Sequence, residues 1–431
     1  MRTEDEVRAL LRRMLDRAPG DEAEVQYRAE RTIATRFGES AITQNTSCED
    51  ETLTLELTFG RRRGAASTNR LDGDAGLDAL FARAEAAARQ LPEDPELVTL
   101  PGRQIYGARP PRWSAATALL SSEVVADDVA QVIAAAGSGF RASGLFQIAL
   151  SQCGIANSRG LSGWDAATSA DYSATLHGPA GSGKAVQSAV AHDRLDPRAL
   201  AVTAVENARM AQNPGSVDPG QYTVVFEPLA VRGLLSYLPW ALDAREADEG
   251  ASAFADTVGR QLVSSRATIR LDTDDPELPV PTMGRRGQAI QPTAWIEAGV
   301  VKRLAHDPFW AAHKGTAPDA AFQPLFMAGG SSTVAELVAG CERGLLVKDL
   351  WYIRNVDWKT FALTGMTRDG VHRIEDGRVV GPVRNLRFNE SPLTFLRNLT
   401  GLSQAVRVGP GMKVPGARSD GFTFTSVTDS V

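Results

Sequence analysis

The chain has 431 residues, with 46 basic and 52 acidic side chains, which gives a formal net charge of −6. Hydrophobic residues make up 43% and charged residues 23%, a globular composition that excludes a disordered or fibrous chain. The mild acidity offers no basic face for nucleic acid, and the single arginine run, Arg61–Arg63, is typical of a solvated turn. No stretch approaches about 18 consecutive apolar residues, so no membrane span is predicted.

The cysteines and the first residues bear on the compartment. Cys48, Cys153 and Cys341 are odd in number and far apart, which is typical of reduced thiols and not of a disulfide framework or a zinc cluster. Acidic residues from Glu4 to Glu6 interrupt any basic segment, and no uncharged apolar run follows, so a signal peptide is not expected. We therefore expect a cytoplasmic protein that binds neither nucleic acid nor membranes.

Residues 1–91 are predicted to form an N-terminal α+β unit. Apolar residues at helical spacing over 7–15 predict an amphipathic helix. Thr52–Phe59 alternates apolar and polar residues as a half-buried strand does, and Ala75–Gln90 has helical spacing. A proline-rich stretch then makes residues 92–114 a linker.

Residues 115–213 are predicted to form a central α+β unit. Its expected elements are a helix over Glu123–Ala136 and strands over Leu145–Gln152, Thr168–His177 and Ala185–His192. Asp196 and Pro197 are an N-cap and a first-turn proline, and they start a helix that extends to about Met210. Strands followed by a helix occur in both units, so two β-β-β-α units from an old duplication are one interpretation, although no residue identities match.

The breaker cluster Asn213–Gly220 marks the main boundary. Residues 214–431 are predicted to form a β-rich C-terminal domain. Within it, Tyr222–Phe226 is a short apolar strand, and Glu227–Ala244 has helical spacing but contains Pro239.

Turn signals follow later in this domain. Asp369-Gly370 and Asp376-Gly377 each predict a hairpin turn, and Ser391 with Pro392 starts a last helix. Strands and helices mix without a regular strand–helix–strand alternation, which favours an α+β fold over a doubly wound sheet.

Three glycine-rich segments imitate known motifs. Gly178–Ala185 nearly matches a phosphate-binding loop, but Ala185 offers no hydroxyl for magnesium, so a glycine-rich hairpin turn is favoured. Gly137–Ala142 imitates a dinucleotide fingerprint but follows a helix instead of a strand. Gly160–Gly163 lacks one residue of a nucleophile elbow and is predicted to be a tight turn.

The candidate metal ligands do not form a recognisable site. His306 and His313 are seven residues apart with Pro308 between them, which is not a ligand spacing that we can defend. The acidic run Asp272–Pro276 lacks the glycine and downstream glutamate of an EF-hand loop, so a capped turn is favoured. From its residues alone, the sequence shows no complete active site.

Several segments nevertheless carry a family resemblance. In chain order they are Ile155–Gly160, Asp218–Phe226, Gly250–Phe254, Val258–Ser264, Asp274–Pro276, Trp295–Val301, Ile374–Gly377 and Pro382–Phe388, and residues 1–90, including Gly64–Asn69, fit more loosely. Their order and spacing resemble the TldD/PmbA family, paired proteins once called modulators of DNA gyrase. The resemblance covers nearly the whole length of the chain.

By this resemblance, the family contains two kinds of chain. The TldD kind is a zinc peptidase in which an H-E-x-x-x-H helix supplies two ligands and a general base, and a cysteine near the C-terminus supplies the third ligand. The corresponding segment here is Gly233–Ala241, and the best register places Ser236 and Ala241 at the histidine positions and Tyr237 at the base position. Serine is a poor neutral ligand, alanine has no donor, and tyrosine has an ordinary pKa of about 10.

Further features of the sequence agree with this interpretation. Pro239 would kink the ligand-bearing helix, no cysteine follows Cys341, and no His-Glu pair occurs in the sequence. The resemblance therefore implies the TldE/PmbA kind of chain, a pseudoenzyme with a degenerate metallopeptidase domain. Such a chain has no catalytic or metal-binding residues of its own, and zinc is expected in the partner chain.

The resemblance also implies partners. They are a TldD-like zinc-bearing homologue, in a heterodimer that encloses a chamber where unfolded or modified peptides are cut, and the extended peptides themselves. A homodimer is the alternative assembly for the chain alone, and the sequence does not decide between the two. Two other interpretations stay open, a homodimeric peptide-binding scaffold without a catalytic partner and an independent enzyme with an unrecognised site. The sequence does not identify the substrate-binding residues.

Overall fold

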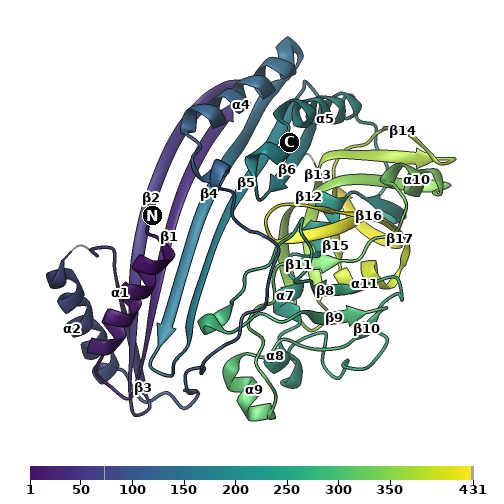
Figure 1. The fold of residues 1–431 in the computed structure, drawn as a ribbon. Helices are drawn as coiled ribbons and strands as arrows, with labels where there is room; N and C mark the ends of the chain where they lie inside the picture. The colour runs from purple at the N-terminus through teal and green to yellow at the C-terminus, as the bar shows by residue number, and fades with distance from the viewer. Residues whose placement is uncertain (72, 429–431) are drawn as a thin grey trace.

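The computed structural model describes residues 1–71 and 73–428, so residue 72 and the last three residues of the predicted domain 214–431 lie outside the described part. The strands form a six-stranded sheet in the N-terminal half and an eleven-stranded sheet in the C-terminal half. Figure 1 shows the long strands of the first sheet standing beside the domain built from the second. The predicted α+β class with a β-rich C-terminal domain is confirmed.

The N-terminal sheet is antiparallel throughout. Its strands are β1 (Glu22–Gly38), β2 (Ala41–Phe59), β3 (Arg62–Thr68), β4 (Arg141–Asn157), β5 (Ser162–His177) and β6 (Ser182–Ala189). Its helices are α1 (Glu4–Arg17), α2 (Asp74–Gln90), α3 (Ala115–Ala118), α4 (Ser122–Ala136) and α5 (Pro197–Met210), with short 3-10 turns η1 (Gly137–Gly139) and η2 (His192–Arg194).

The strand order is β3-β2-β1-β4-β5-β6, which is symmetric about the boundary between β1 and β4. In each half of this sheet, three consecutive strands are followed by a helix, α2 in the first half and α5 in the second. The two predicted β-β-β-α units are therefore present. They are the two halves of one continuous sheet.

Helices cover one face of this sheet. Val7, on α1, is fully buried against the strands, in a cluster that includes Tyr27 of β1. Farther along the strands, α4 and α5 cover a second cluster that contains Phe146. Because side chains alternate along a strand, the residues between these buried positions, such as Arg28, project from the opposite face. That face lies toward the C-terminal domain (Figure 1).

Local sequence patterns correctly predicted the positions of several of these helices and strands. Asp196 caps α5 by accepting bonds from the backbone N–H groups of Arg198 and Ala199, as its sequence predicted. The expected strands of the central unit lie within or beside β4, β5 and β6, and each observed strand is longer or shifted by a few residues.

The sequence interpretation missed β1 entirely and the first half of β2. Residues 41–51 of β2 are exposed or half-buried on both faces, so they show no apolar alternation. They lie beyond the end of β3, which pairs only with residues 53–59 of β2. Strand β1 does alternate, from Ala23 to Ala29, but Glu and Arg on its polar face make the segment look solvated.

The C-terminal domain is a mixed sheet wrapped by short helices. Its strands are β7 (Gly220–Phe226), β8 (Ile269–Leu271), β9 (Thr293–Glu297), β10 (Val300–Val301), β11 (Leu325–Met327), β12 (Arg343–Asp357), β13 (Ala362–Glu375), β14 (Arg378–Pro382), β15 (Leu386–Glu390), β16 (Leu399–Arg407) and β17 (Met412–Val427). Its helices are α6 (Pro228–Leu235), α7 (Leu238–Ala241), α8 (Ala244–Asp248), α9 (Pro308–Lys314), α10 (Val334–Ala339) and α11 (Pro392–Arg397), with a 3-10 turn η3 (Arg285–Gly287).

One of the two predicted hairpin turns in this domain is wrong. Asp376-Gly377 does connect β13 to β14, and both residues have positive φ as a type I′ turn requires. Asp369-Gly370 instead lies inside β13, where the pairing with β12 shifts register between Val347 and Asp349. The segment is a β-bulge. A bulge and a hairpin turn both use positive φ, so the dipeptide alone could not separate them.

No helix among residues 1–71 and 73–428 is both long enough and apolar enough to cross a membrane.

Candidate functional site

The segment predicted to hold degenerate metal positions is an interrupted helix. Helix α6 ends at Leu235 and α7 begins at Leu238, with Pro239 in the first turn of α7. Ser236 is the C-cap of α6, and its Oγ donates to the carbonyl oxygen of Gly233 at 2.7 Å. The proline predicted to disturb this helix therefore lies where a second short helix starts.

The other two predicted positions, Tyr237 and Ala241, are occupied by a hydrogen bond and by core packing. The Tyr237 hydroxyl donates to the carbonyl oxygen of Ile353 at 2.8 Å, and Ala241 is fully buried in the main core of the domain. Cys341 is also buried, in a small apolar cluster between α10 and the sheet. These residues do not fit a zinc ion, because the segment presents one hydroxyl already bonded to a backbone carbonyl, one phenol and one methyl group.

No alternative metal site replaces it in the described residues. Within residues 1–71 and 73–428, no three His, Cys, Asp or Glu side chains come together in a way that could hold a metal ion. Asp275 instead caps a turn by accepting from the backbone N–H groups of Glu277 and Leu278, as predicted for the acidic run.

The near phosphate-binding loop is a hairpin between β5 and β6, as favoured from its sequence. Its glycines are explained by helix packing, because a Cβ on Gly183 would lie 2.0 Å from the backbone nitrogen of Ala208 in α5. Lys184 extends from the other side of β6 and forms an ion pair of 2.8 Å with Asp349 on β12. The segment therefore joins two parts of the chain and leaves its lysine no role in phosphate binding.

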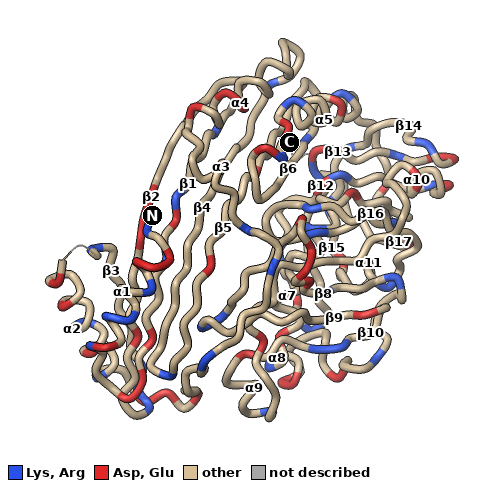
Figure 2. The backbone as a smooth tube through the Cα atoms, in the orientation of Figure 1, with Lys and Arg blue, Asp and Glu red and all other residues tan. Residues whose placement is uncertain are grey.

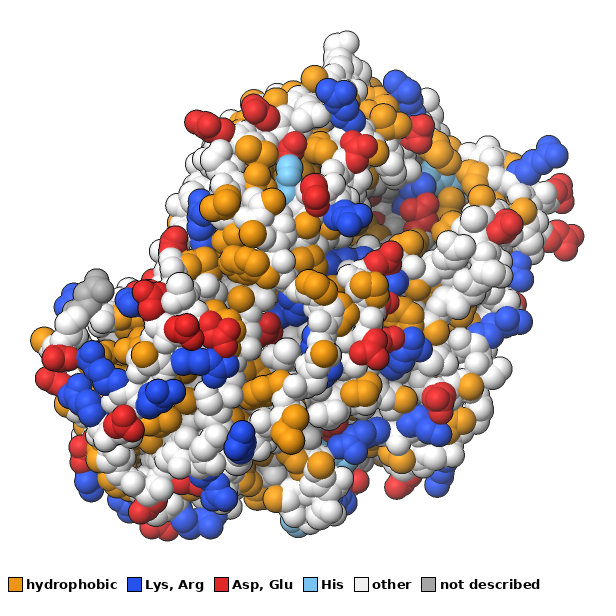
Figure 3. Space-filling view, viewed as in Figure 1, with side chains coloured by type: hydrophobic (Ala, Val, Ile, Leu, Met, Phe, Trp, Pro, Cys, Tyr) orange, Lys and Arg blue, Asp and Glu red, His pale blue; other side chains and the backbone are white. Residues whose placement is uncertain are grey.

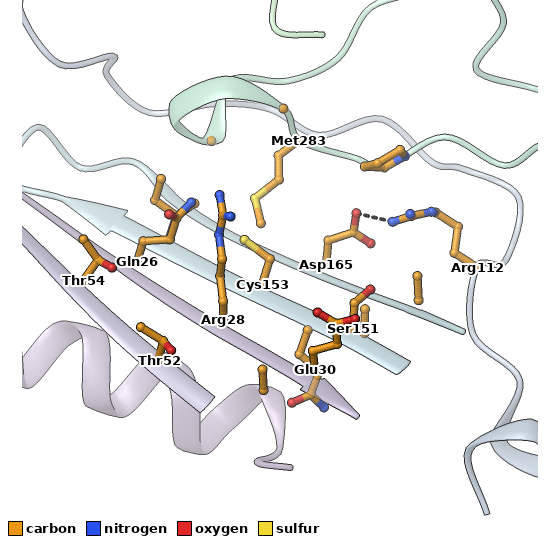
Figure 4. Close-up of a pocket in the computed structure, with 18 of the residues that line it drawn as sticks. Gln26, Arg28, Glu30, Thr52, Thr54, Arg112, Ser151, Cys153, Asp165 and Met283 are labelled. Carbon is orange, nitrogen blue, oxygen red and sulfur yellow. Dashed lines mark hydrogen bonds and ion pairs between the residues drawn. The ribbon is translucent and has the colours of Figure 1, made fainter. Parts of the chain in front are cut away.

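A groove with a volume of about 770 Å³ lies on the polar face of the N-terminal sheet, between that sheet and the C-terminal domain. Its floor includes a row of side chains that neighbour each other across four paired strands, Thr52, Arg28, Cys153 and Asp165. Figure 4 shows this row with Met283 projecting toward it from the opposite wall. The groove thus combines one charged sheet face with a loop of the second domain.

The groove is polar, and its charges are only partly matched. Asp165 accepts from Arg112 at 2.5 Å, and this ion pair is drawn at one end of the row in Figure 4. Burial raises the pKa of Asp165, and the Arg112 guanidinium opposes that shift. The exposed Arg28 forms no ion pair among the described residues and leaves a guanidinium free in the groove.

Cys153 is the only thiol in the groove lining, and its surroundings make it a poor nucleophile. Burial raises the pKa of the Cys153 thiol, and the smaller effect of Arg28 lowers it. The reactive form of a cysteine is the thiolate, so this raised pKa disfavours covalent chemistry. We therefore do not expect the Cys153 thiol to act as a nucleophile in this groove.

Among the polar contacts that join the two domains are the Arg286 contact and the Lys184 contact. In the Arg286 contact, Arg286 reaches from the C-terminal domain to Glu56 at 2.7 Å and to Glu24 at 3.2 Å. In the Lys184 contact, Lys184 pairs with Asp349, and Ser182 donates to Asp369 at 2.6 Å. Figure 2 shows basic and acidic residues along this junction.

The backbone next to Arg286 packs closely against the N-terminal sheet. Gly287 has a φ of +70°, and a Cβ there would lie 2.7 Å from Leu161 in the turn between β4 and β5. That turn, residues 158–161, overlaps the predicted tight turn Gly160–Gly163, and Gly163 itself lies in β5. Buried Asn157 accepts from the backbone N–H groups of Arg159 and Leu161. The sequence predicted this turn, but it did not indicate that the groove residues lie together. Those residues come from four strands and a distant loop, so no local pattern connects them.

The surface around the groove carries no large patch of one sign. Figure 3 shows basic and acidic side chains interspersed over the visible face of the molecule. An electrostatic footprint for nucleic acid requires a clustered basic surface, which this face does not present.

Fold and site together define an α+β protein with a long sheet that shares a polar groove with a β-rich C-terminal domain. Residues 219–426 of that domain match the family model described as the PmbA/TldA metallopeptidase C-terminal domain. This match confirms the predicted TldD/PmbA family for the C-terminal domain.

Three solved structures share the fold over nearly the whole chain. TldE from Thermococcus kodakarensis has a TM-score of 0.87 at 18% identity and covers 97% of this chain and 100% of its own. Proposed DNA gyrase modulators from Thermotoga maritima and Bacteroides thetaiotaomicron have TM-scores of 0.87 and 0.85 at 15% and 20% identity. They cover 98% and 99% of this chain and 100% of their own. No curated protein matches the sequence significantly.

Proposed function

We propose that this chain is a zinc-free, TldE/PmbA-like subunit of a TldD/TldE-type peptidase complex. In this role it binds and positions unfolded or modified peptides, and a zinc-bearing partner cleaves them. The observation that carries the proposal is the α6–α7 segment, where Ser236, Tyr237 and Ala241 are bonded or buried in ways that leave no donor set for a metal.

The groove supports the peptide-binding part of the proposal. Its floor offers Arg28, which has no ion-pair partner in residues 1–71 and 73–428, together with Gln26, Thr52 and Thr54. These groups can bond the carbonyl and N–H groups of an extended chain. Beside it, residues 41–51 of β2 extend past the end of β3 and leave one strand edge without a partner among the described strands. An extended peptide can add to such an edge by backbone hydrogen bonds.

Two measurements test the proposal together. The purified chain should contain much less than one equivalent of zinc by elemental analysis, and it should not hydrolyse unfolded casein alone. When it is mixed with a zinc-bearing homologue from its own host, chelator-sensitive cleavage should appear or increase. Stoichiometric zinc in the isolated chain, or sustained cleavage by it, contradicts the proposal.

Affinity purification from the native host separates this proposal from the scaffold interpretation. Recovery of a homologue that carries H-E-x-x-x-H supports the complex. Recovery of this chain only with itself favours a homodimeric peptide-binding scaffold.

A further inference from the structure

A second cavity, of about 660 Å³, lies within the C-terminal domain beside α7. Its wall includes Trp240 of α7, Trp358 after β12, and Phe322 before β11. Ala241 of the same helix is one of the positions where the family resemblance places a metal ligand in zinc-bearing chains. The cavity is therefore a separate site next to the degenerate segment, and the groove residues do not line it.

The aromatic wall contacts other aromatic rings, and Trp240 is open to solvent. The Trp240 side chain is 60% exposed, a large fraction for an indole, and its ring lies 5.7 Å from that of Tyr237. Trp358 stacks on Phe361 with an interplanar angle of 13°, and Phe322 stacks on Trp295 at 4.3 Å. Each of the three rings therefore has an aromatic neighbour that supports its orientation.

Carboxylates outnumber cations around the same cavity. Asp243, Glu246, Asp307 and Asp319 line it, and Arg285 is the only lysine or arginine in the lining. Arg303 pairs with Asp319 at 2.9 Å and neutralises that carboxylate.

The remaining acids keep oxygens available. Asp243 and Asp307 each cap a helix through Oδ1, at 3.0 Å and 2.8 Å from the backbone nitrogens of Glu246 and Trp310. The exposed Glu246 carboxylate forms no ion pair within residues 1–71 and 73–428. Since each carboxylate has two oxygens, at least three acidic side chains can face a ligand.

We propose that this cavity binds an organic cation, such as the guanidinium or ammonium group of a basic side chain. Aromatic faces attract cations through their quadrupole, and the carboxylates supply charge-assisted hydrogen bonds to the same group. A metal ion is a poorer match, because the described part of the chain has no group of ligating side chains that could hold one. If the cation is part of a peptide substrate, that role rests on the proposed function, whereas cation binding itself does not.

Calorimetric titration of the full chain tests this inference without any partner. The probes are blocked pentapeptides with arginine, citrulline or glutamate at the centre of an alanine sequence. Citrulline keeps the shape of arginine and removes its charge. We expect the arginine peptide to bind about tenfold more tightly than the citrulline peptide, and the glutamate peptide to bind more weakly still.

Variants then locate the binding site. Trp240→Ala and Glu246→Gln should each weaken arginine-peptide binding about fivefold, and Trp240→Phe should retain most of the affinity. Glu206→Gln is the matched control, because Glu206 is an exposed carboxylate on α5, away from the cavity lining. Both cavity residues are exposed, and unchanged melting temperatures would verify that the variants fold.

Equal affinity for the arginine and citrulline peptides overturns the inference, as does arginine binding that survives both cavity variants. Either result leaves the proposed peptidase partnership standing, because that is judged by zinc content and co-purification. The converse result is also distinguishable. If no zinc-bearing partner is found but the arginine peptide binds through Trp240, the cation-binding inference stands and the proposed function is contradicted.

Discussion

The two faces of the N-terminal sheet are built from the same strands but are stabilised in different ways. On one face, Phe146 stacks on Tyr172 at 3.9 Å and meets Phe37 edge-on at 5.5 Å beneath α4 and α5. The other face meets the C-terminal domain through the Arg286 and Lys184 contacts and leaves a groove between them. Apolar burial thus stabilises the helix-covered face, whereas ion pairs contribute to the contact between the polar face and the C-terminal domain.

The two faces should also respond differently to substitution, one mainly in stability and the other mainly in its contacts. Helix-face residues are nearly all fully buried, so changing them should mainly affect folding. Residues on the polar face, such as Arg28 and Thr54, are half-buried or exposed, so changing them should mainly affect domain contact or binding.

The largest expected effect comes from the helix-covered face. Phe146→Ala removes a fully buried ring from the stacked cluster and should lower the free energy of unfolding by about 4 kcal/mol. Urea denaturation followed by tryptophan fluorescence measures the change. Thr54→Ala, on the polar face, is the control and should shift the midpoint little. A small effect of Phe146→Ala would contradict the distinction between the two faces.

The Lys184 contact should give the next largest effect. Lys184→Met leaves Asp349, whose side chain is only 5% exposed, without its ion-pair partner, and should cost about 3 kcal/mol. The double variant Lys184→Met/Asp349→Leu removes both charges and should recover most of that loss. Chemical denaturation of both variants gives the comparison. If the double variant is as unstable as the single one, the ion pair is not the cause.

The same junction should make stability depend on pH. Burial, followed by the positive charge of Lys348, lowers the pKa of His372 to about 4 from its ordinary 6.5, against a weaker opposing effect of the Met210 backbone. Between pH 6.5 and 4 the unfolded chain therefore takes up a proton that the folded chain does not. Stability should fall by up to about 3 kcal/mol as the pH decreases through this range.

Comparing His372→Gln with the parent chain isolates this contribution. The variant cannot titrate, so its unfolding midpoint should decline less steeply from pH 6.5 to 4. Parallel pH profiles for the two proteins would show that His372 is not the group responsible.

The smallest effect on stability is expected in the groove. Arg28→Ala should change the free energy of unfolding by less than about 0.5 kcal/mol, because the side chain is exposed and forms no ion pair among the described residues. If the groove holds peptides, the same variant should weaken binding of unfolded casein peptides about tenfold in calorimetric titration. Arg12→Ala, an exposed arginine of α1, serves as the matched control. Equal binding by both variants would remove Arg28 from the peptide site.

Local signals in the sequence predicted much of the fold. The N-cap at Asp196, the helix over α2 and the turn at Asp376-Gly377 each depend on residues within one turn or one strand of each other. The absence of a His-Glu pair is likewise a property of the sequence itself. Strand β1 was missed although its alternation is present, because charged residues on the polar face obscured it.

What the sequence determined by itself is the α+β class, many helix and strand positions in the N-terminal half, the family resemblance and the absence of a His-Glu pair. Only the tertiary structure decided what the polar face meets. Lys184 and Asp349 are 165 positions apart, and Asp369 became a bulge residue through its pairing across two strands. Local periodicity follows from the backbone geometry of each element, whereas contacts between distant segments depend on how the two sheets pack against each other.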